Sequence, residues 1–324
     1  MRTMHFYPES WPLHTAFVIS RGSRTEAKVV VMELEENGVC GIGECTPYPR
    51  YGESESSVMA QLAWVAKVVE GGLSRDALQV LLPAGAARNA LDSALWQLEC
   101  AMARQSLWQR SEIDEPTDIS MAQTVSIGTP EAMAYHACLL AQQGAKLLKI
   151  KLDGHLIAER LVAIRTAVPE ITLIVDANES WQPEGLAGRC QLLADLGVAM
   201  LEQPLPAGKD ETLLNFIHPL PICADESCHT RADLPRLVNR YEMVNIKLDK
   251  SGGLTEALLL AKEARQLGFD IMLGCMLCTS RAIRAALPLA PAARFIDLDG
   301  PTWLARDVAD GLNFSCGAIN QLAS

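Results

Sequence analysis

Apolar and polar positions alternate with two different periods, and the change of period divides the chain into two regions. In the first, residues 28–35 and 39–45 are apolar, strand-like runs on either side of Glu36-Asn37-Gly38, which predicts a β-hairpin. Residues 54–69 and 86–104 then show the apolar spacing of helices. Residues 1–118 are therefore expected to form an α+β capping domain.

From residue 122 onward, strand-like runs alternate with helical segments. Eight strands are expected to end near residues 127, 151, 176, 203, 225, 248, 274 and 298. One intervening helix is expected to begin at Thr129-Pro130-Glu131, because threonine caps helices and proline fits the first turn, and to stop at Gly144. This alternation, with seven helices between the strands, is typical of a parallel barrel.

No helical pattern follows the eighth strand, because Asp299-Gly300-Pro301 comes directly after it. The predicted fold is therefore α/β, a modified TIM barrel of the form (β/α)7β. The barrel is expected over residues 119–299, and a tail over 300–324 is expected to return to the capping domain.

Composition and charge indicate a globular protein and argue against nucleic-acid-binding and membrane-spanning classes. The chain has 324 residues, of which 49% are hydrophobic, so a large core can form. A net charge of −11 and the absence of a basic cluster argue against a nucleic-acid partner. No apolar run approaches the roughly 20 residues that cross a bilayer. Ten cysteines, mostly within apolar segments and without an apolar leader, predict reduced, buried thiols in a cytoplasmic protein.

Candidate chemistry lies at the predicted strand ends, where barrel enzymes carry their active sites. Lys149 and Lys151 are two apart on the second strand, so their side chains share a face. Neighbouring positive charges favour loss of a proton from one of them, and such a lysine can act as a base. The alternative is a solvated strand end.

Three carboxylates end the third, fourth and fifth strands: Asp176, Glu202 and Asp225. Gathered on one rim they would repel one another unless a cation neutralised them. Oxygen ligands alone favour Mg²⁺ over Zn²⁺, so one Mg²⁺ per subunit is expected here. The alternative is that each residue caps the helix that follows its strand.

Lys247 ends the sixth strand, which lies diametrically opposite the second in an eight-stranded barrel. Lys151 and Lys247 are thus expected to face each other across the barrel mouth, with Lys149 lowering the pKa of Lys151. One lysine could remove an α-proton and the other return a proton to the opposite face, as a racemase or epimerase requires. A β-eliminase or cycloisomerase could use the same arrangement with one lysine idle.

The motifs around these residues occur in the order found in a known enzyme family. With Lys149-x-Lys151, Asp176-x-Asn178, Glu202-Gln203-Pro204, Ala224-Asp225-Glu226-Ser227, Asn245-Ile246-Lys247 and the Gly41-x-Gly43-Glu44 stretch, nearly the whole chain resembles the enolase superfamily, muconate-lactonising subgroup. Within it, Asp297-Leu298-Asp299 resembles the Asp-x-Asp pair with which dipeptide epimerases bind an α-ammonium group. The resemblance implies epimerisation of the murein-derived dipeptides L-Ala-D-Glu and L-Ala-L-Glu at the glutamyl α-carbon.

The same resemblance implies further substrate contacts. Thr124 would lie along the dipeptide, Lys149 would meet its carboxylate, and Arg21 or Arg24 of the lid would meet the glutamyl side chain. The loop at Cys275 would line the pocket; its C-x-x-C spacing is not in a redox context.

Several alternatives stay open at the level of sequence. They are another member of the superfamily (a cycloisomerase, o-succinylbenzoate synthase or N-acylamino acid racemase), a Schiff-base aldolase using Lys149 or Lys151, and a non-catalytic binder. The expected partner is a small dipeptide, and whether the chain forms a homo-oligomer is left open.

Overall fold

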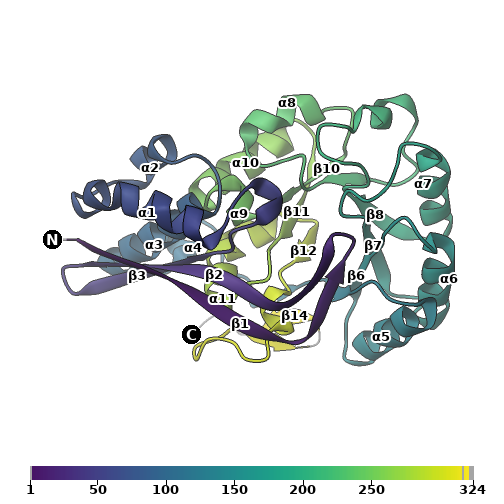
Figure 1. The fold of residues 1–324 in the computed structure, drawn as a ribbon, viewed down its shortest axis with the longest axis horizontal. Coiled ribbons are helices and arrows are strands. Elements are labelled where there is room, and N and C mark those ends of the chain that lie inside the picture. Colours follow the sequence, from purple (N-terminus) through teal and green to yellow (C-terminus); the bar gives the residue numbers. More distant parts are fainter. Residues whose placement is uncertain (1, 316, 321–324) are drawn as a thin grey trace.

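The computed structural model describes residues 2–315 and 317–320, which form a capping domain, a barrel and a tail (Figure 1). The cap contains an antiparallel sheet of three strands, β1 (Thr3–Ile19), β2 (Gly22–Glu36) and β3 (Val39–Cys45). The hairpin predicted around Asn37-Gly38 is confirmed. The 17-residue β1 was not predicted, because Pro8 and Pro12 interrupt its pattern; as an edge strand it tolerates both.

Short and long helices complete the cap. Its elements are η1 (Pro49–Tyr51), α1 (Glu55–Glu70), α2 (Arg75–Leu81), α3 (Ala86–Ala103) and α4 (Leu107–Ser111). The two helices predicted from spacing correspond to α1 and α3. Ser54 caps α1 by accepting a hydrogen bond from Ser57 N. The buried face of α3 packs on β3, which places the helix between the cap sheet and the barrel.

All eight predicted barrel strands are present, and they lie side by side in sequence order as one parallel sheet. They are β5 (Gln123–Val125), β6 (Leu147–Lys151), β7 (Thr172–Asp176), β8 (Val198–Glu202), β9 (Ile222–Ala224), β10 (Met243–Ile246), β11 (Asp270–Gly274) and β12 (Phe295–Asp297). Ala122 N donates to Ile296 O at 2.7 Å across the seam between the first and last strands. This near-closure brings all eight carboxyl ends to one rim.

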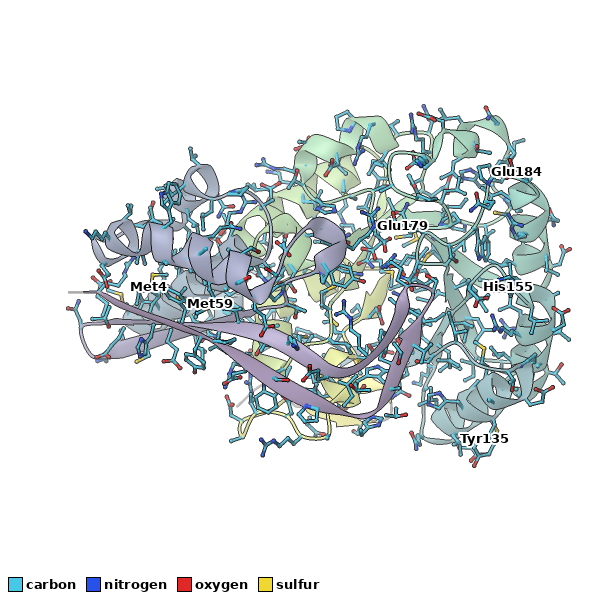
Figure 2. The ribbon with its side chains drawn as sticks, viewed as in Figure 1. Met4, Met59, Tyr135, His155, Glu179 and Glu184 are labelled. Carbon is cyan, nitrogen blue, oxygen red and sulfur yellow. The ribbon has the colours of Figure 1, made fainter. Side chains whose placement is uncertain are left out.

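The connections between strands differ in length. They contain α5 (Pro130–Gln142), α6 (Ile157–Ala167), α7 (Leu186–Asp195), η2 (Glu211–Asn215), η3 (Arg231–Asp233), α8 (Leu234–Leu237), α9 (Leu248–Ser251), α10 (Leu254–Gln266), α11 (Ser280–Ala286) and η4 (Leu287–Ala292). Thr129 caps α5 as predicted, and Tyr135 projects from its outer face (Figure 2). The expectation of seven regular helices is wrong between β8 and β9, where the 3₁₀ helix η2 takes the place of an α-helix. Pro206, Gly208 and Pro219 lie in this connection and disfavour a longer helix, because proline has no backbone N–H to donate and Gly208 has a positive φ.

The tail packs against strand β1 of the cap and against strand β4 (Asp118–Ser120). η5 (Gly300–Trp303) lies against β1, and Ala305 N donates to Pro12 O at 2.8 Å. Further on, β13 (Asn313–Ser315) and β14 (Ala318–Asn320) form a small antiparallel sheet with β4 (Asp118–Ser120). Residues 316 and 321–324 of the expected tail lie outside the described residues. None of the helices in the described ranges has the length and apolar character needed to span a bilayer.

Candidate active site

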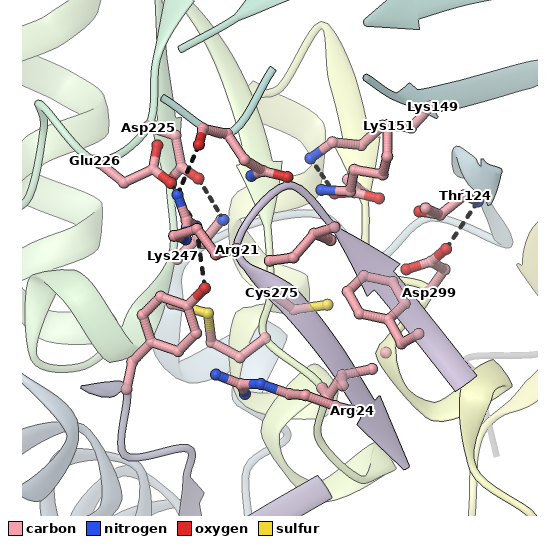
Figure 3. A pocket seen from close by; sticks show the side chains of 18 of the residues that line it. Arg21, Arg24, Thr124, Lys149, Lys151, Asp225, Glu226, Lys247, Cys275 and Asp299 are labelled. Carbon is pink, nitrogen blue, oxygen red and sulfur yellow. Dashed lines mark hydrogen bonds and ion pairs between the residues drawn. The ribbon is translucent and has the colours of Figure 1, made fainter. Parts of the chain in front are cut away.

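A pocket lies between the tip of the β1–β2 hairpin and the carboxyl ends of the barrel strands (Figure 3). It brings together ten of the twelve residues singled out from the sequence: Arg21, Arg24, Thr124, Lys149, Lys151, Asp225, Lys247, Cys275, Asp297 and Asp299. The other two, Asp176 and Glu202, are fully buried at the ends of β7 and β8.

Lys149 and Lys151 share one face of β6, as strand periodicity predicts. Both ammonium groups reach Asp176 Oδ2, at 3.2 Å for Lys149 and 2.6 Å for Lys151. Lys149 also lies 2.7 Å from Glu202 Oε2 and 2.8 Å from Asp297 Oδ2. Burial alone would lower the pKa of Lys149, but these carboxylates outweigh it and hold the pKa well above its usual range. Lys149 therefore carries a fixed positive charge beside Lys151.

Lys247 follows β10, four strands away from β6. Its Nζ lies 2.7 Å from Asp225 Oδ2. Figure 3 shows Lys247 with Asp225 on one side of the pocket and the two β6 lysines on the other. Burial acts to lower the pKa of Lys247, but Asp225 and Glu202 raise it above its usual range. The two predicted bases thus lie on opposite sides of one space.

A fourth lysine in the site, Lys250, was missed by sequence reasoning. Its buried Nζ donates to Asp225 Oδ1 and Asp225 O, both at 2.6 Å, and to Asn245 O at 2.8 Å. Burial raises the pKa of Asp225, but Lys247 and Lys250 outweigh burial and hold it well below its usual range. Its position in the sequence could have identified it. Lys250 lies three residues after Lys247, and this spacing places both side chains on the same side of the short helix α9.

The three predicted metal ligands meet at the rim, with Asp176 directly beside Glu202 in the strand register. Among the described residues, no three acidic, histidine or cysteine side chains stand close enough to hold a metal ion as they are. Each of the three carboxylates instead contacts a lysine ammonium group, Lys149 for Asp176 and Glu202 and Lys247 for Asp225.

The donor atoms nevertheless fit a hard cation, because all three side chains offer carboxylate oxygens. Asn178 Oδ1 and Asn245 Oδ1, next to these carboxylates, are buried oxygens without a hydrogen-bond partner among the described residues. Buried oxygens normally have such a partner. The site therefore has acceptor capacity that its own donors do not use.

Asp297 and Asp299 form an acidic corner of the pocket at the end of β12. Asp299 Oδ2 accepts hydrogen bonds from Thr124 N at 2.9 Å and from Trp303 Nε1 at 3.3 Å. Asp297 Oδ1 is buried and has no hydrogen-bond partner within the described chain. Burial, together with the Asp297 charge, raises the pKa of Asp299 to about 6. Two carboxylates with a free acceptor suit a cationic group such as an ammonium.

The contacts of the two lid arginines differ, although the sequence left both as candidates to bind the glutamyl side chain. Arg21 contacts Glu226 Oε1 at 2.8 Å and Glu179 Oε2 at 3.2 Å, so its charge is already paired. Arg24 has no ion pair in the described part of the chain; its guanidinium lies over the Tyr48 ring, 4.9 Å from the centroid. Arg24 is thus the guanidinium that remains free to meet an anion in the pocket.

The cysteines play a minor part in the pocket. The nine described cysteines are all free thiols, and Cys275 is half-buried in the pocket wall next to buried Cys278. The expectation that the thiols are buried is wrong for Cys40, which is exposed at the end of the cap hairpin.

Comparisons with known proteins agree with this geometry. The model of the mandelate racemase / muconate lactonizing enzyme N-terminal domain matches residues 1–110, and the enolase C-terminal domain-like model matches residues 132–319. The chain is 68% identical to L-Ala-D/L-Glu epimerase of Escherichia coli K12 over 99% of its length and all of that protein. It is 44% identical to N-acetyl-D-glutamate racemase of a Pseudoalteromonas species, covering 91% of this chain and 94% of the relative.

Solved structures show the same likeness. An L-Ala-D/L-Glu epimerase structure superimposes with a TM-score of 0.95 at 66% identity, covering 99% of both chains. An Agrobacterium tumefaciens enolase family member with bound sodium and L-Ala-L-Glu superimposes with a TM-score of 0.97 at 43% identity, covering 100% of this chain and 98% of that one. The chain therefore belongs to the mandelate racemase/muconate lactonizing enzyme family of the enolase superfamily.

Proposed function

We propose that this protein is a Mg²⁺-dependent isomerase that interconverts L-Ala-D-Glu and L-Ala-L-Glu. The observation that carries the proposal is one pocket with Lys151 and Lys247 on opposite sides and an acidic pair, Asp297 and Asp299, at its edge. The 68% identical L-Ala-D/L-Glu epimerase and the related structure with bound L-Ala-L-Glu support this substrate. A role in murein peptide metabolism and a cytoplasmic location stay predictions from the sequence.

The charges of the pocket match those of the dipeptide. The α-ammonium group of alanine would meet Asp297 and Asp299, where Asp297 Oδ1 has an unused acceptor. The γ-carboxylate of glutamate would meet Arg24, the guanidinium without an ion pair among the described residues. The α-carboxylate would lie near Lys149, whose charge is fixed by its buried surroundings. Three charged anchors leave the glutamyl α-carbon between the two lysines.

The reaction then needs two proton transfers. The lysine on one face, in its neutral form, takes the α-proton, and the resulting carbanion is delocalised into the carboxylate as an enolate. The ammonium group of the opposite lysine donates a proton to the other face, which inverts the configuration. Because the reverse reaction exchanges the roles, each lysine serves as the base for one isomer.

Asp176, Glu202 and Asp225 are the residues that would hold Mg²⁺, and related dipeptide epimerase structures contain Mg. When bound, the ion supplies positive charge that makes the α-proton more acidic. Asp225 now pairs with both Lys247 and Lys250. Sharing its charge with a further cation would weaken its hold on the Lys247 proton and let Lys247 act as a base.

A second candidate is racemisation of N-acetylglutamate, the substrate in the name of the 44% identical relative. That molecule has no ammonium group, so the Asp297–Asp299 corner would face an uncharged acetyl group and bury its charge without a partner. We therefore place it second.

Proton NMR in D₂O tests both candidates. With Mg²⁺, the glutamyl α-proton of both Ala-Glu isomers should exchange for deuterium, and EDTA should stop the exchange. In Lys247→Ala, exchange should survive from one isomer only, whereas Lys262→Ala, at an exposed position on α10, should behave like the wild type. Exchange from both isomers in Lys247→Ala would contradict the two-base mechanism. Faster exchange from N-acetylglutamate than from the dipeptides would favour the second candidate.

A further inference from the structure

One buried carboxylate, Glu179, binds two separate loops of the cap to the barrel. Arg50 of η1 donates to Glu179 Oε2 through Nε and to Oε1 through Nη2, both at 2.7 Å. Arg21, at the tip of the β1–β2 hairpin, reaches Glu179 Oε2 at 3.2 Å. The Glu179 side chain is 7% exposed, against 40% for Arg50. Figure 2 shows Glu179 near the hairpin tip, at the junction of cap and barrel.

The barrel holds Glu179 in place on its own side. Asn178 (φ 44°) and Glu179 (φ 64°), directly after the β7 aspartate and Ala177, have left-handed backbone conformations that residues with a Cβ rarely adopt. Glu179 N donates to Gln203 O at 2.8 Å, and Glu179 Oε1 accepts from Ala207 N at 2.8 Å. The loops after β7 and β8 thus maintain an uncommon turn whose result is a fixed carboxylate aimed at the cap.

Arg21 extends the contact to a second barrel carboxylate. Its guanidinium contacts Glu226 Oε1 at 2.8 Å and donates to Tyr48 Oη and Asn178 O, both at 3.0 Å (Figure 3). We call Arg21, Arg50, Glu179 and Glu226 the cap latch. It contains two positive and two negative side chains, and each of its ion pairs joins the cap to the barrel.

The cap latch lies next to Arg24, the proposed contact for the glutamyl side chain. Arg24 is three residues from Arg21 and lies over the ring of Tyr48, whose hydroxyl oxygen accepts a hydrogen bond from Arg21. Arg21 and Arg24 both contact Tyr48, so breaking the ion pairs of Arg21 and Arg50 would also loosen the position of Arg24. Ion pairs that are partly buried and bidentate hold geometry better than exposed single contacts.

We propose that Glu179 is a positioning residue that holds the two cap loops closed over the bound dipeptide. It sets substrate affinity and residence time and takes no part in proton transfer. The inference rests on the proposed function for the identity of the substrate, but the closure itself does not depend on it.

The test compares Arg50→Gln and Glu179→Gln with Arg231→Gln. Arg231 and Glu256 form a similar bidentate pair, 41% and 9% exposed, outside the pocket. With L-Ala-L-Glu, both latch variants should raise KM by roughly tenfold and change kcat by less than about threefold. The double variant should be no worse than Glu179→Gln alone, because both residues act through one contact. Arg231→Gln should leave KM and kcat unchanged.

Amide hydrogen exchange gives a readout that needs no turnover. Residues 19–24 should exchange faster in Glu179→Gln than in the wild type, because Arg21 loses one of its two carboxylate partners. They should exchange at the wild-type rate in Arg231→Gln. The proposal is overturned if both latch variants keep the wild-type KM and exchange rate, or if kcat falls with KM unchanged, which would mean a role in chemistry. If the wild type does not act on the dipeptide, the proposed function fails, while the exchange experiment still decides whether the cap latch exists.

Discussion

At the scale of single residues, the site depends on which charges are already paired inside the protein and which are left for a ligand. Arg21 is paired twice and Arg24 not at all within the described chain, although the two lie in the same hairpin tip. Asp299 is held by Thr124 and Trp303, whereas Asp297 keeps a free buried oxygen. We expect the groups without a partner, the Arg24 guanidinium and Asp297 Oδ1, to contact substrate, because a buried polar atom left without a partner is costly.

The Arg24 assignment predicts a change of specificity. In Arg24→Gln, kcat/KM for L-Ala-L-Glu should fall by about 10- to 100-fold, since a charge-assisted hydrogen bond contributes about 1.5–3 kcal/mol. For L-Ala-L-Gln, which lacks the side-chain carboxylate, the fall should be less than about threefold. Arg306→Gln, at an exposed guanidinium over Trp11, is the matched control. Equal losses for both substrates would show that Arg24 does not meet the glutamyl carboxylate.

The acidic corner predicts recognition of the ammonium group. Asp297→Asn should lower kcat/KM for L-Ala-L-Glu by at least about tenfold, because the amide removes a charge that faces the cation. Inhibition by N-acetyl-L-Ala-L-Glu, which has no ammonium, should change little. Competition assays measure both values, and a parallel weakening of the two compounds would argue against this role.

At the scale of elements, the position of the cap depends on how closely β3 and α3 approach. A Cβ on Gly43 would lie 2.0 Å from Ala90 O, and one on Gly41 would lie 2.2 Å from Ala94 O. Both glycines lie on the face of β3 that meets the helix, with Ile42 between them on the other face. Only residues without a side chain allow this approach, which explains the Gly41-x-Gly43 spacing noted in the sequence.

Replacing Gly43 therefore tests this packing. Gly43→Ala should lower the free energy of unfolding by about 2–3 kcal/mol, because strand or helix must move to admit the methyl group. Gly188→Ala, within α7 where an added Cβ meets nothing within 4 Å, should be neutral or slightly stabilising. Urea unfolding of the two variants measures the difference, and similar stabilities would show that β3 and α3 can separate without cost.

At the scale of the whole molecule, the cap is docked on the barrel through buried carboxyl groups as well as through the cap latch. Glu44 of β3 accepts hydrogen bonds from Thr279 N at 2.7 Å and Thr279 Oγ1 at 2.5 Å. Asp249 Oδ1 accepts from Thr46 N at 3.0 Å and Asn89 Nδ2 at 2.8 Å. Burial raises the pKa of both groups to about 7, against the hydrogen bonds that lower it.

The raised pKa of Glu44 makes docking dependent on pH. A carboxyl whose pKa is higher in the folded state favours folding at low pH, and this contribution is lost as pH rises from about 4.5 to about 7. Between pH 5 and pH 8, the wild type should lose about 2–3 kcal/mol of stability relative to Glu44→Gln, in which the group cannot ionise. Urea unfolding across this pH range measures the loss. The exposed Glu184→Gln should follow the wild type, and parallel curves for all three would refute the prediction.

The sequence by itself determined the barrel, the order of its strands and most of the residues around the pocket. Strand periodicity and the position of polar residues at strand ends are local properties, so Lys149, Lys151 and Asp176 could be placed on the same rim without a structure. The order of the strands then put Lys247 opposite them. These predictions needed only the spacing of residues within each βα unit and the order of the units along the chain.

Only the tertiary structure decided which charges pair across distant parts of the chain. The contacts of Lys250 with Asp225, Thr124 N with Asp299 and Arg50 with Glu179 join residues 25, 175 and 129 positions apart. Such contacts are set by loop conformations and by docking of the cap, which no local period records. The choice of Arg24 over Arg21 is of the same kind, because it follows from Glu179 and Glu226, which lie on the barrel and not in the lid.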